Sequence, residues 1–171
     1  DWARPPAVPM TLPNLSSDAS LPVILQHSSG STGMQKGVQL NHHKVITQCQ
    51  SYGEFIDYDG NSDAICSWLP MYHDMGLFTA WMMPLVLGGT VNLLDPFSWV
   101  QNPASIVNLA NQVRGTLIWQ PNFAFNLLAD RVSDEHAQSL DLSCMRGFTN
   151  CSEPVHQKVM ARFQAHFAKA G

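Results

Sequence analysis

Charged side chains are scarce in this sequence. Asp, Glu, Lys and Arg make up 13% of the 171 residues, about half of the share that is usual in a soluble domain. Two explanations stay open: a compact α/β domain with many buried strands, or a surface that further chain covers in the complete protein. The net charge is −4, and no cluster of Lys or Arg forms a basic patch of the kind that binds nucleic acid. We therefore expect no nucleic-acid partner.

Closely spaced cysteines and long apolar runs are also missing. No two cysteines have the two-residue spacing of a zinc knuckle, and a chain of this length needs no disulfides to fold. The histidines His27, His42, His43 and His73 show no zinc-site spacing either. The longest apolar run, from Met75 to Gly89, contains Pro84 and is too short to span a bilayer. The sequence thus predicts free thiols in a reducing compartment, and a cytoplasmic protein, or a segment of one, without a membrane span.

Apolar residues are plentiful, at 45%, and they fall into alternating short runs and helical patterns. Residues 1–20 are rich in Pro, Ser and Asp and are interpreted as a linker or entering loop. The predicted strands are 21–26 (interpreted as buried), 38–40, 64–69, 90–94, 116–119 and 145–149, and the predicted helices are 42–55, 75–87 (bent or ended near Pro84), 103–113, 121–131 and 154–168. This alternation predicts an α/β fold with a mostly parallel sheet and helices on both faces.

The stretch from Ser28 to Gly37 is the most informative part of the chain. Glycines, hydroxyl side chains and Lys36 are packed closely together after a strand. Glycine lets backbone N–H groups turn toward an anion, and Lys36 adds a positive charge, so the loop is a candidate cradle for polyphosphate. It is not a Walker loop, because Gln35 stands where the second glycine of that pattern belongs. The alternative interpretation is a flexible Gly/Ser surface loop.

A neighbouring His73–Asp74 pair precedes an apolar helix. Such a pair fits a general base with its orienting group, half of a metal site, or a capped helix start with Asp74 as the cap. A serine hydrolase that uses Ser29 or Ser31 with this pair is disfavoured. The Gly-x-Ser-x-Gly elbow is absent, and adjacent His and Asp side chains rarely orient each other as a triad needs.

Four segments carry a resemblance to adenylate-forming (AMP-binding) enzymes, the superfamily of acyl-CoA synthetases, luciferases and peptide-synthetase adenylation domains. Leu25 to Gly37 resembles their signature loop Thr-Ser-Gly-Ser/Thr-Thr-Gly-x-Pro-Lys-Gly, with Ser28 and Gln35 as departures. Ser67 to Leu77 resembles the segment LPxYHDMGL of fatty acyl-AMP ligases. Pro121 to Phe125 is similar to PNFAY, and Asn150 to Pro154 is similar to NGAEP, with Cys151-Ser152 in place of Gly-Ala.

The resemblance implies a set of residue roles around ATP and a carboxylic acid. Lys36 and His73 would be catalytic. The phosphates of ATP would be held by Ser29, Gly30, Ser31, Thr32, Gly33, Lys36 and Gly37, with Thr32 near Mg²⁺. The adenine side would be Cys151, Ser152, Glu153 and Pro154, and the acyl pocket Tyr72, His73, Met75, Asn122 and Phe123. For Phe123, ordinary core packing is an equally good interpretation. The bulky residues Trp81, Met82, Met83, Trp119 and Phe123 suggest an apolar acid.

The implied activity is ATP-dependent formation of an acyl-adenylate with release of pyrophosphate. A thiol, of CoA or of the phosphopantetheine on an acyl carrier protein, would then take the acyl group. The resemblance covers residues 21–171 as part of the large N-terminal domain of such a ligase, without its remaining subdomains or its C-terminal lid domain. We therefore expect the isolated chain to be inactive. The alternative is a non-catalytic remnant or interaction module, which the departures at Gln35 and Cys151-Ser152 leave open.

Overall fold

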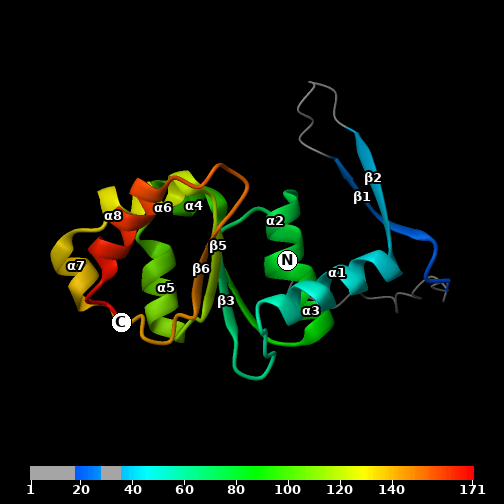
Figure 1. Cartoon of the computed structure of the whole chain (residues 1–171), viewed down its shortest axis with the longest axis horizontal. Helices are drawn as coiled ribbons and strands as arrows, with labels where there is room; N and C mark the ends of the chain where they lie inside the picture. Colours follow the sequence, from blue (N-terminus) through cyan, green and yellow to red (C-terminus); the bar gives the residue numbers. More distant parts are fainter. Residues whose placement is uncertain (1–17, 28–35) are drawn as a thin grey trace, which may run out of the picture. The chain divides into compact units, whose positions relative to one another are not determined.

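The computed structural model describes residues 18–27 and 36–171 of the chain. Contacts divide the chain into two units, Asp1–Val45 and Ile46–Gly171, and helix α1 (His42–Phe55) runs across the boundary. Most of the predicted linker, and the central part of the predicted phosphate loop, lie outside the described residues. Figure 1 shows the larger unit as a sheet with helices on both faces.

The smaller unit contains a two-stranded antiparallel ribbon. Strand β1 (Pro22–His27) pairs with β2 (Gly37–Asn41), with Leu25 opposite Gln39 and His27 opposite Gly37. The prediction that the first strand is buried is wrong, because the side chain of Leu25 is 64% exposed. In the described part of the chain β1 pairs with β2 alone, and the side chains of Val23, Leu25 and Val38 are exposed.

The larger unit is built on a four-stranded parallel sheet, as the alternation of strands and helices predicts. Its strands are β3 (Ala64–Ser67), β4 (Thr90–Leu93), β5 (Leu117–Gln120) and β6 (Gly147–Asn150), in the spatial order β4-β3-β5-β6. Ile65 lies opposite Val91 on one side and Leu117 on the other. Ile65 and Ile118 are fully buried, as expected for strands that are covered on both faces.

Helices cover the two faces of this sheet in an order that the topology requires. The connection from β3 to β4 runs one way along the sheet, and the connection from β4 to β5 runs back past β3. Right-handed crossovers therefore put the intervening helices on opposite faces, as Figure 1 shows. One face carries α2 (Asp74–Leu77), η1 (Phe78–Met82) and α3 (Met83–Leu87), and the other carries α4 (Pro96–Gln101), α5 (Ser105–Val113), α6 (Asn122–Arg131), α7 (Asp134–Ser139) and α8 (Gln157–Phe167).

The helix predicted at 75–87 changes type in its middle and does not end at Pro84. The π-helical segment η1 joins α2 to α3, and the N–H of Met83 donates to the carbonyl of Phe78, five residues earlier. Pro84 has no N–H to continue the α-helical pattern, so a shift in hydrogen-bond register lets the chain stay helical past it.

Two short helices were not predicted, and one predicted helix starts later. Helix α4 begins at an N-cap, Asp95, whose Oδ2 accepts from the N–H of Ser98 at 2.7 Å. Helix α7 begins in the same way at Ser133, which accepts from the N–H of His136. Helix α8 starts at Gln157 instead of Pro154, which leaves Val155 outside the helix and 58% exposed, while Phe163 and Phe167 are buried as predicted.

The core beneath α4, α6 and α8 is aromatic. Trp68, which follows β3, stacks on Trp99 of α4 with ring centroids 3.6 Å apart and planes inclined by 3°. Phe125 of α6 meets Phe163 of α8 edge to face at 5.0 Å. Trp99 and Phe125 are fully buried. These contacts therefore hold α4, α6 and α8 against the sheet near the ends of its strands.

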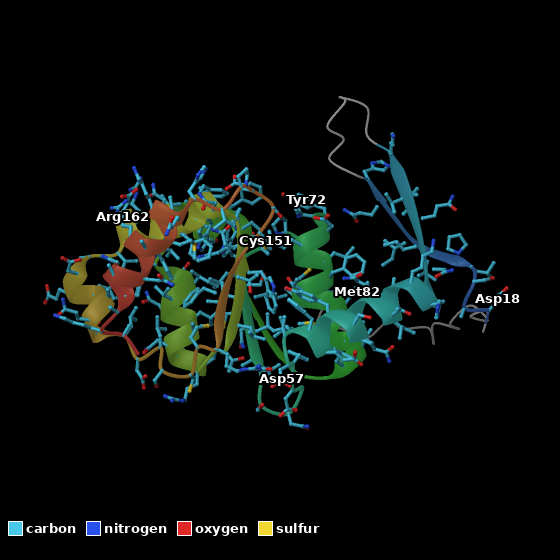
Figure 2. All side chains as sticks on the ribbon, viewed as in Figure 1. Asp18, Asp57, Tyr72, Met82, Cys151 and Arg162 are labelled. Carbon is cyan, nitrogen blue, oxygen red and sulfur yellow. The ribbon has the colours of Figure 1, made fainter. Side chains whose placement is uncertain are left out.

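A buried charged network ties together the amino ends of three strands. Asp63, Thr116 and Arg146 immediately precede β3, β5 and β6. The buried Asp63 carboxylate forms an ion pair with Arg146 and accepts from Thr116 Oγ1 at 2.7 Å. Arg146 Nη2 also donates to the carbonyl of Asp57 at 2.8 Å. Figure 2 shows Asp57 at the edge of the larger unit opposite Tyr72 and Cys151, so this network is remote from the strand ends that carry the predicted site.

Candidate active site

Three of the four segments singled out in the sequence converge at one edge of the parallel sheet. They are residues 68–74, 121–123 and 151–154, which directly follow β3, β5 and β6. Because the strands are parallel, their carboxyl ends share this edge. The neighbours β3 and β5 have connections that leave in opposite directions, and such a switch point is where open α/β sheets bind ligands. The parallel arrangement thus gathers predicted acyl and adenine residues that are far apart in sequence.

His73 and Asp74 lie at the start of the helix that follows β3. His73 is the N-cap of α2, and Asp74 is its first residue, so the assignment of the cap to Asp74 is wrong. Both side chains reach the N–H of Met75, with His73 Nδ1 at 3.2 Å and Asp74 Oδ1 at 2.8 Å. Two acceptors therefore compete for one amide at this helix start.

Asp74 determines which nitrogen of the His73 ring is engaged. His73 Nδ1 is 2.8 Å from Asp74 Oδ1. When the ring carries a proton on both nitrogens, Nδ1 donates to this carboxylate, which in turn accepts from the N–H of Met75. His73 Nε2 is then left for a ligand. His73 and Asp74 are thus in contact, whereas Ser29 and Ser31, the serines considered for a triad, lie outside the described residues.

The first turn of α6 is joined to the segment after β6 by side-chain hydrogen bonds. The carboxylate of Glu153 accepts from the N–H of Phe123 at 3.0 Å. Asn122 Oδ1 accepts from Asn150 Nδ2 at 3.0 Å and from the N–H of His156 at 3.1 Å. The predicted adenine residue Glu153 and the predicted acyl-pocket residues Asn122 and Phe123 are thus brought into contact.

Phe123 is packed on one side and exposed on the other. Its ring meets Trp68 and Trp99 edge to face, with centroids 6.2 Å and 6.3 Å away, yet the residue remains 49% exposed. Of the other bulky residues, Met83 and Trp119 are buried, whereas Trp81 is 46% exposed. One side of the Phe123 ring therefore packs on the core and the other is available at the sheet edge.

Cys151 and Ser152 differ in what they impose on the backbone. The left-handed conformation falls on Ser152, with φ 68°, and Cys151 is not among the residues with positive φ. Replacing the glycine of the NGAEP pattern by Cys151 therefore costs no backbone strain of this kind. Burial raises the pKa of the Cys151 thiol to about 11, which keeps it protonated and a poor nucleophile at neutral pH.

The strain at Ser152 leads to a stability prediction. Glycine adopts left-handed φ without the Cβ clash, although it gains more freedom in the unfolded chain. We expect Ser152→Gly to raise the free energy of unfolding by about 0.5–1 kcal/mol and Ser152→Val to lower it by about 1–2 kcal/mol. Urea denaturation of both variants measures this. A stabilising valine would show that the turn is not left-handed in solution.

Two residues near this edge were missed by sequence reasoning. Tyr52 of α1 accepts at its hydroxyl from Trp119 Nε1 at 2.7 Å. Gln120, the last residue of β5, is fully buried, and neither Nε2 nor Oε1 has a hydrogen-bond partner among the described residues. The sequence alone could have singled out Gln120, because it is the one polar residue in the apolar run from Leu117 to Pro121.

The predicted phosphate loop connects the ends of the antiparallel ribbon. His27 and Gly37 are paired at the ribbon end, and Lys36 precedes Gly37 on an exposed part of the chain. A Cβ at Gly37 would lie 3.3 Å from Leu25 Cδ1, so a larger residue would crowd the strand that leads into the loop. Ser29, Gly30, Ser31, Thr32 and Gly33 lie outside the described residues, and their predicted role stays a prediction.

Comparison with known proteins assigns the family. A profile of the AMP-binding enzymes matches residues 3–170. The chain belongs to the AMP-binding enzyme family. It is 39% identical over 148 residues to the 4-hydroxyphenylalkanoate adenylyltransferase of Mycobacterium marinum, covering 84% of this chain and 24% of that protein. It is 37% identical over 147 residues to the medium-chain-fatty-acid–[acyl-carrier-protein] ligase TtuA of Teredinibacter turnerae, covering 86% and 23%.

Solved structures agree with this AMP-binding assignment. The fatty acyl-adenylate ligase of L. pneumophila, in complex with acyl adenylate and pyrophosphate, superposes with a TM-score of 0.81 at 33% identity, over 86% of this chain and 26% of that one. The predicted family and fold class are thereby confirmed. The chain spans about a quarter of the length of the relatives it matches.

Within residues 18–27 and 36–171, no helix combines the length and apolar character needed to cross a membrane.

Proposed function

We propose that the protein to which this chain belongs activates a fatty or other largely apolar carboxylic acid with ATP. An oxygen of the carboxylate attacks the α-phosphorus of ATP, the bond from that phosphorus to the bridging oxygen breaks, and acyl-adenylate and pyrophosphate form. A thiol then attacks the acyl carbon, and AMP leaves. The observation that carries the proposal is the convergence of the His73, Asn122 and Glu153 segments at the carboxyl edge of the sheet of an AMP-binding enzyme.

The chain's own residues act by positioning and by charge neutralisation, which dominate catalysis of phosphoryl-group chemistry. Lys36 and residues 29–33 would hold the β- and γ-phosphates, and Thr32 would help to hold a Mg²⁺ ion, which would neutralise phosphate charge. His73 Nε2 faces the reacting carboxylate and phosphate, because Asp74 engages Nδ1. The segment 151–154 takes the adenine, and Tyr72, Met75 and Phe123 border the acyl chain.

The acceptor thiol belongs either to CoA or to phosphopantetheine on an acyl carrier protein. The relative TtuA is named as a ligase for an acyl carrier protein, which supports the second choice. The described residues carry no feature that separates the two acceptors.

The test is ATP–pyrophosphate exchange by the full-length protein across a panel of fatty and aryl acids. We expect exchange that depends on one acid class and falls at least about tenfold in Lys36→Ala. Lys158→Ala, which removes an exposed lysine from α8, is the matched control and should leave exchange unchanged. The isolated 171-residue chain should give no exchange.

Two results would contradict the proposal. Absence of exchange with every acid, in a protein that is folded, would favour the non-catalytic interpretation, with Gln35 as the first residue to restore to proline. Exchange that survives Lys36→Ala at the wild-type rate would remove Lys36 from the phosphate site while leaving the adenylation reaction in place.

A further inference from the structure

The start of α6 and the segment after β6 hold each other reciprocally. Asn122, the first residue of α6, sends its side chain to Asn150 and His156, on both sides of the segment. Glu153, within the segment, sends its side chain back to the N–H of Phe123. We call these three hydrogen bonds the Asn122–Glu153 clamp.

The clamp is suited to its place for two physical reasons. The first N–H groups of a helix have no partner within the helix, and the positive end of the helix dipole favours a carboxylate there, which Glu153 supplies for α6. Asn122 is only 7% exposed, so its Oδ1 would be costly to leave unpaired, and the two donors satisfy it. Releasing Asn122 would leave its buried Oδ1 unpaired, whereas releasing Glu153 would leave the N–H of Phe123 to solvent.

The clamped segment also contains the strained residue of this edge. Ser152 holds φ 68° one residue before Glu153, and a left-handed residue of this kind persists where its surroundings hold it. The hydrogen bonds of Asn150, Glu153 and His156 lie on both sides of Ser152 and supply that constraint.

We propose that Asn122 and Glu153 are positioning residues that fix the adenine-binding segment 151–154 against the first turn of α6. This inference rests on the proposed function, because it assigns the segment to ATP. The clamp sets the distance between the bound nucleotide and the acyl side of the site without touching the reacting atoms. Loosening it weakens the binding of ATP first, and that of the acid less.

The experiment compares Glu153→Ala, Glu153→Gln and Asn122→Ala in the full-length protein. We expect Glu153→Ala to raise the KM for ATP about three- to tenfold, with a smaller change in the KM for the acid. Glu153→Gln should recover most of the loss, because its amide oxygen still accepts from the N–H of Phe123. Glu135→Ala removes the same charge from the first turn of α7 and should change neither KM.

Hydrogen–deuterium exchange gives a second readout that does not depend on activity. In Glu153→Ala the amides of residues 121–125 and 151–157 should exchange faster than in the wild type, and Asn122→Ala should show the same pattern. A KM for ATP that is unchanged in Glu153→Ala, in a wild type that catalyses exchange, would overturn the clamp's role. A wild type without any ATP–pyrophosphate exchange would instead remove the proposed function itself.

Discussion

Replacing Arg146 by alanine should destabilise the chain by about 2–4 kcal/mol, the largest effect on stability that we expect from a single charge. The substitution leaves the Asp63 carboxylate buried, with Thr116 and the N–H of Asp59 as its remaining donors. It also frees the carbonyl of Asp57, which Arg146 holds. Removing one partner of a buried ion pair costs about 3–5 kcal/mol, and the value here is lower because the Arg146 side chain is 39% exposed.

The same substitution should change how stability depends on pH. Burial raises the pKa of Asp63, but the hydrogen bonds from Thr116 and Arg146 lower it by more, so its pKa lies below the usual value. A depressed carboxyl pKa adds stability above the pKa of the unfolded state, and that stability is lost as the pH falls through the folded pKa. Without Arg146, the hydrogen bonds offset the effect of burial less fully, and the pKa of Asp63 in the folded state rises. Acid unfolding should therefore begin at a higher pH.

Urea denaturation from pH 7 downward measures both effects, and the chain offers a matched control. Arg114 pairs with Asp141 at 3.1 Å, but both side chains are 59% exposed, and exposed pairs contribute about 0–1 kcal/mol. Arg114→Ala should therefore cost far less stability than Arg146→Ala at neutral pH. Equal losses from Arg114→Ala and Arg146→Ala would show that the burial of Asp63 does not decide the energetics.

Local sequence patterns were sufficient to predict the parallel sheet of the larger unit. The runs at Ile65 and Ile118 are short, apolar and bounded by Gly or Pro, and they became strands buried on both faces. The helix predicted at residues 121–131 was also correct within one residue. These elements follow from periodicity and from residues that end them, both of which act over a few positions.

Pairing and exposure could not be obtained in this way. The run at 21–26 has the composition of a buried strand, but its antiparallel pairing with β2 and its exposure depend on what lies next to it in space. Helices α4 and α7 have six residues each, too few for a helical period to emerge, although Asp95 and Ser133 were visible as possible caps.

The contacts between the predicted site segments could not be obtained from the sequence. Resemblance placed His73, Asn122 and Glu153 in one site, and parallel topology placed their segments at one edge. Nothing in the sequence indicated that Glu153 reaches the N–H of Phe123, since these residues are 30 positions apart and each has an adequate local explanation. Contacts of this kind are set by packing, which short-range patterns do not encode.

In the full-length protein, His73→Ala should lower kcat for ATP–pyrophosphate exchange by about 10²–10³-fold, the range seen when a preorganised donor to a developing charge is removed. The expectation follows from the ring's geometry. Asp74 Oδ1 lies 2.8 Å from Nδ1 and orients the ring, and a ring that is protonated on both nitrogens then has its Nε2–H available to donate to an oxygen of the phosphate or carboxylate. His43→Ala, which removes an exposed histidine from α1, is the matched control and should leave kcat unchanged.

Substitutions at Asp74 separate orientation from charge. Asp74→Asn keeps an oxygen that can accept from His73 Nδ1 and from the N–H of Met75, so we expect a loss of only a few-fold in kcat. Asp74→Ala removes that acceptor and leaves the N–H of Met75, 3.2 Å from Nδ1, as the remaining partner of this nitrogen. Its kcat should therefore fall about tenfold or more, toward the value of His73→Ala.

If Asp74→Asn were as impaired as Asp74→Ala, the charge of Asp74 would matter more than the orientation it gives the ring. A His73→Ala protein with a kcat within threefold of the wild type would exclude His73 from the reaction.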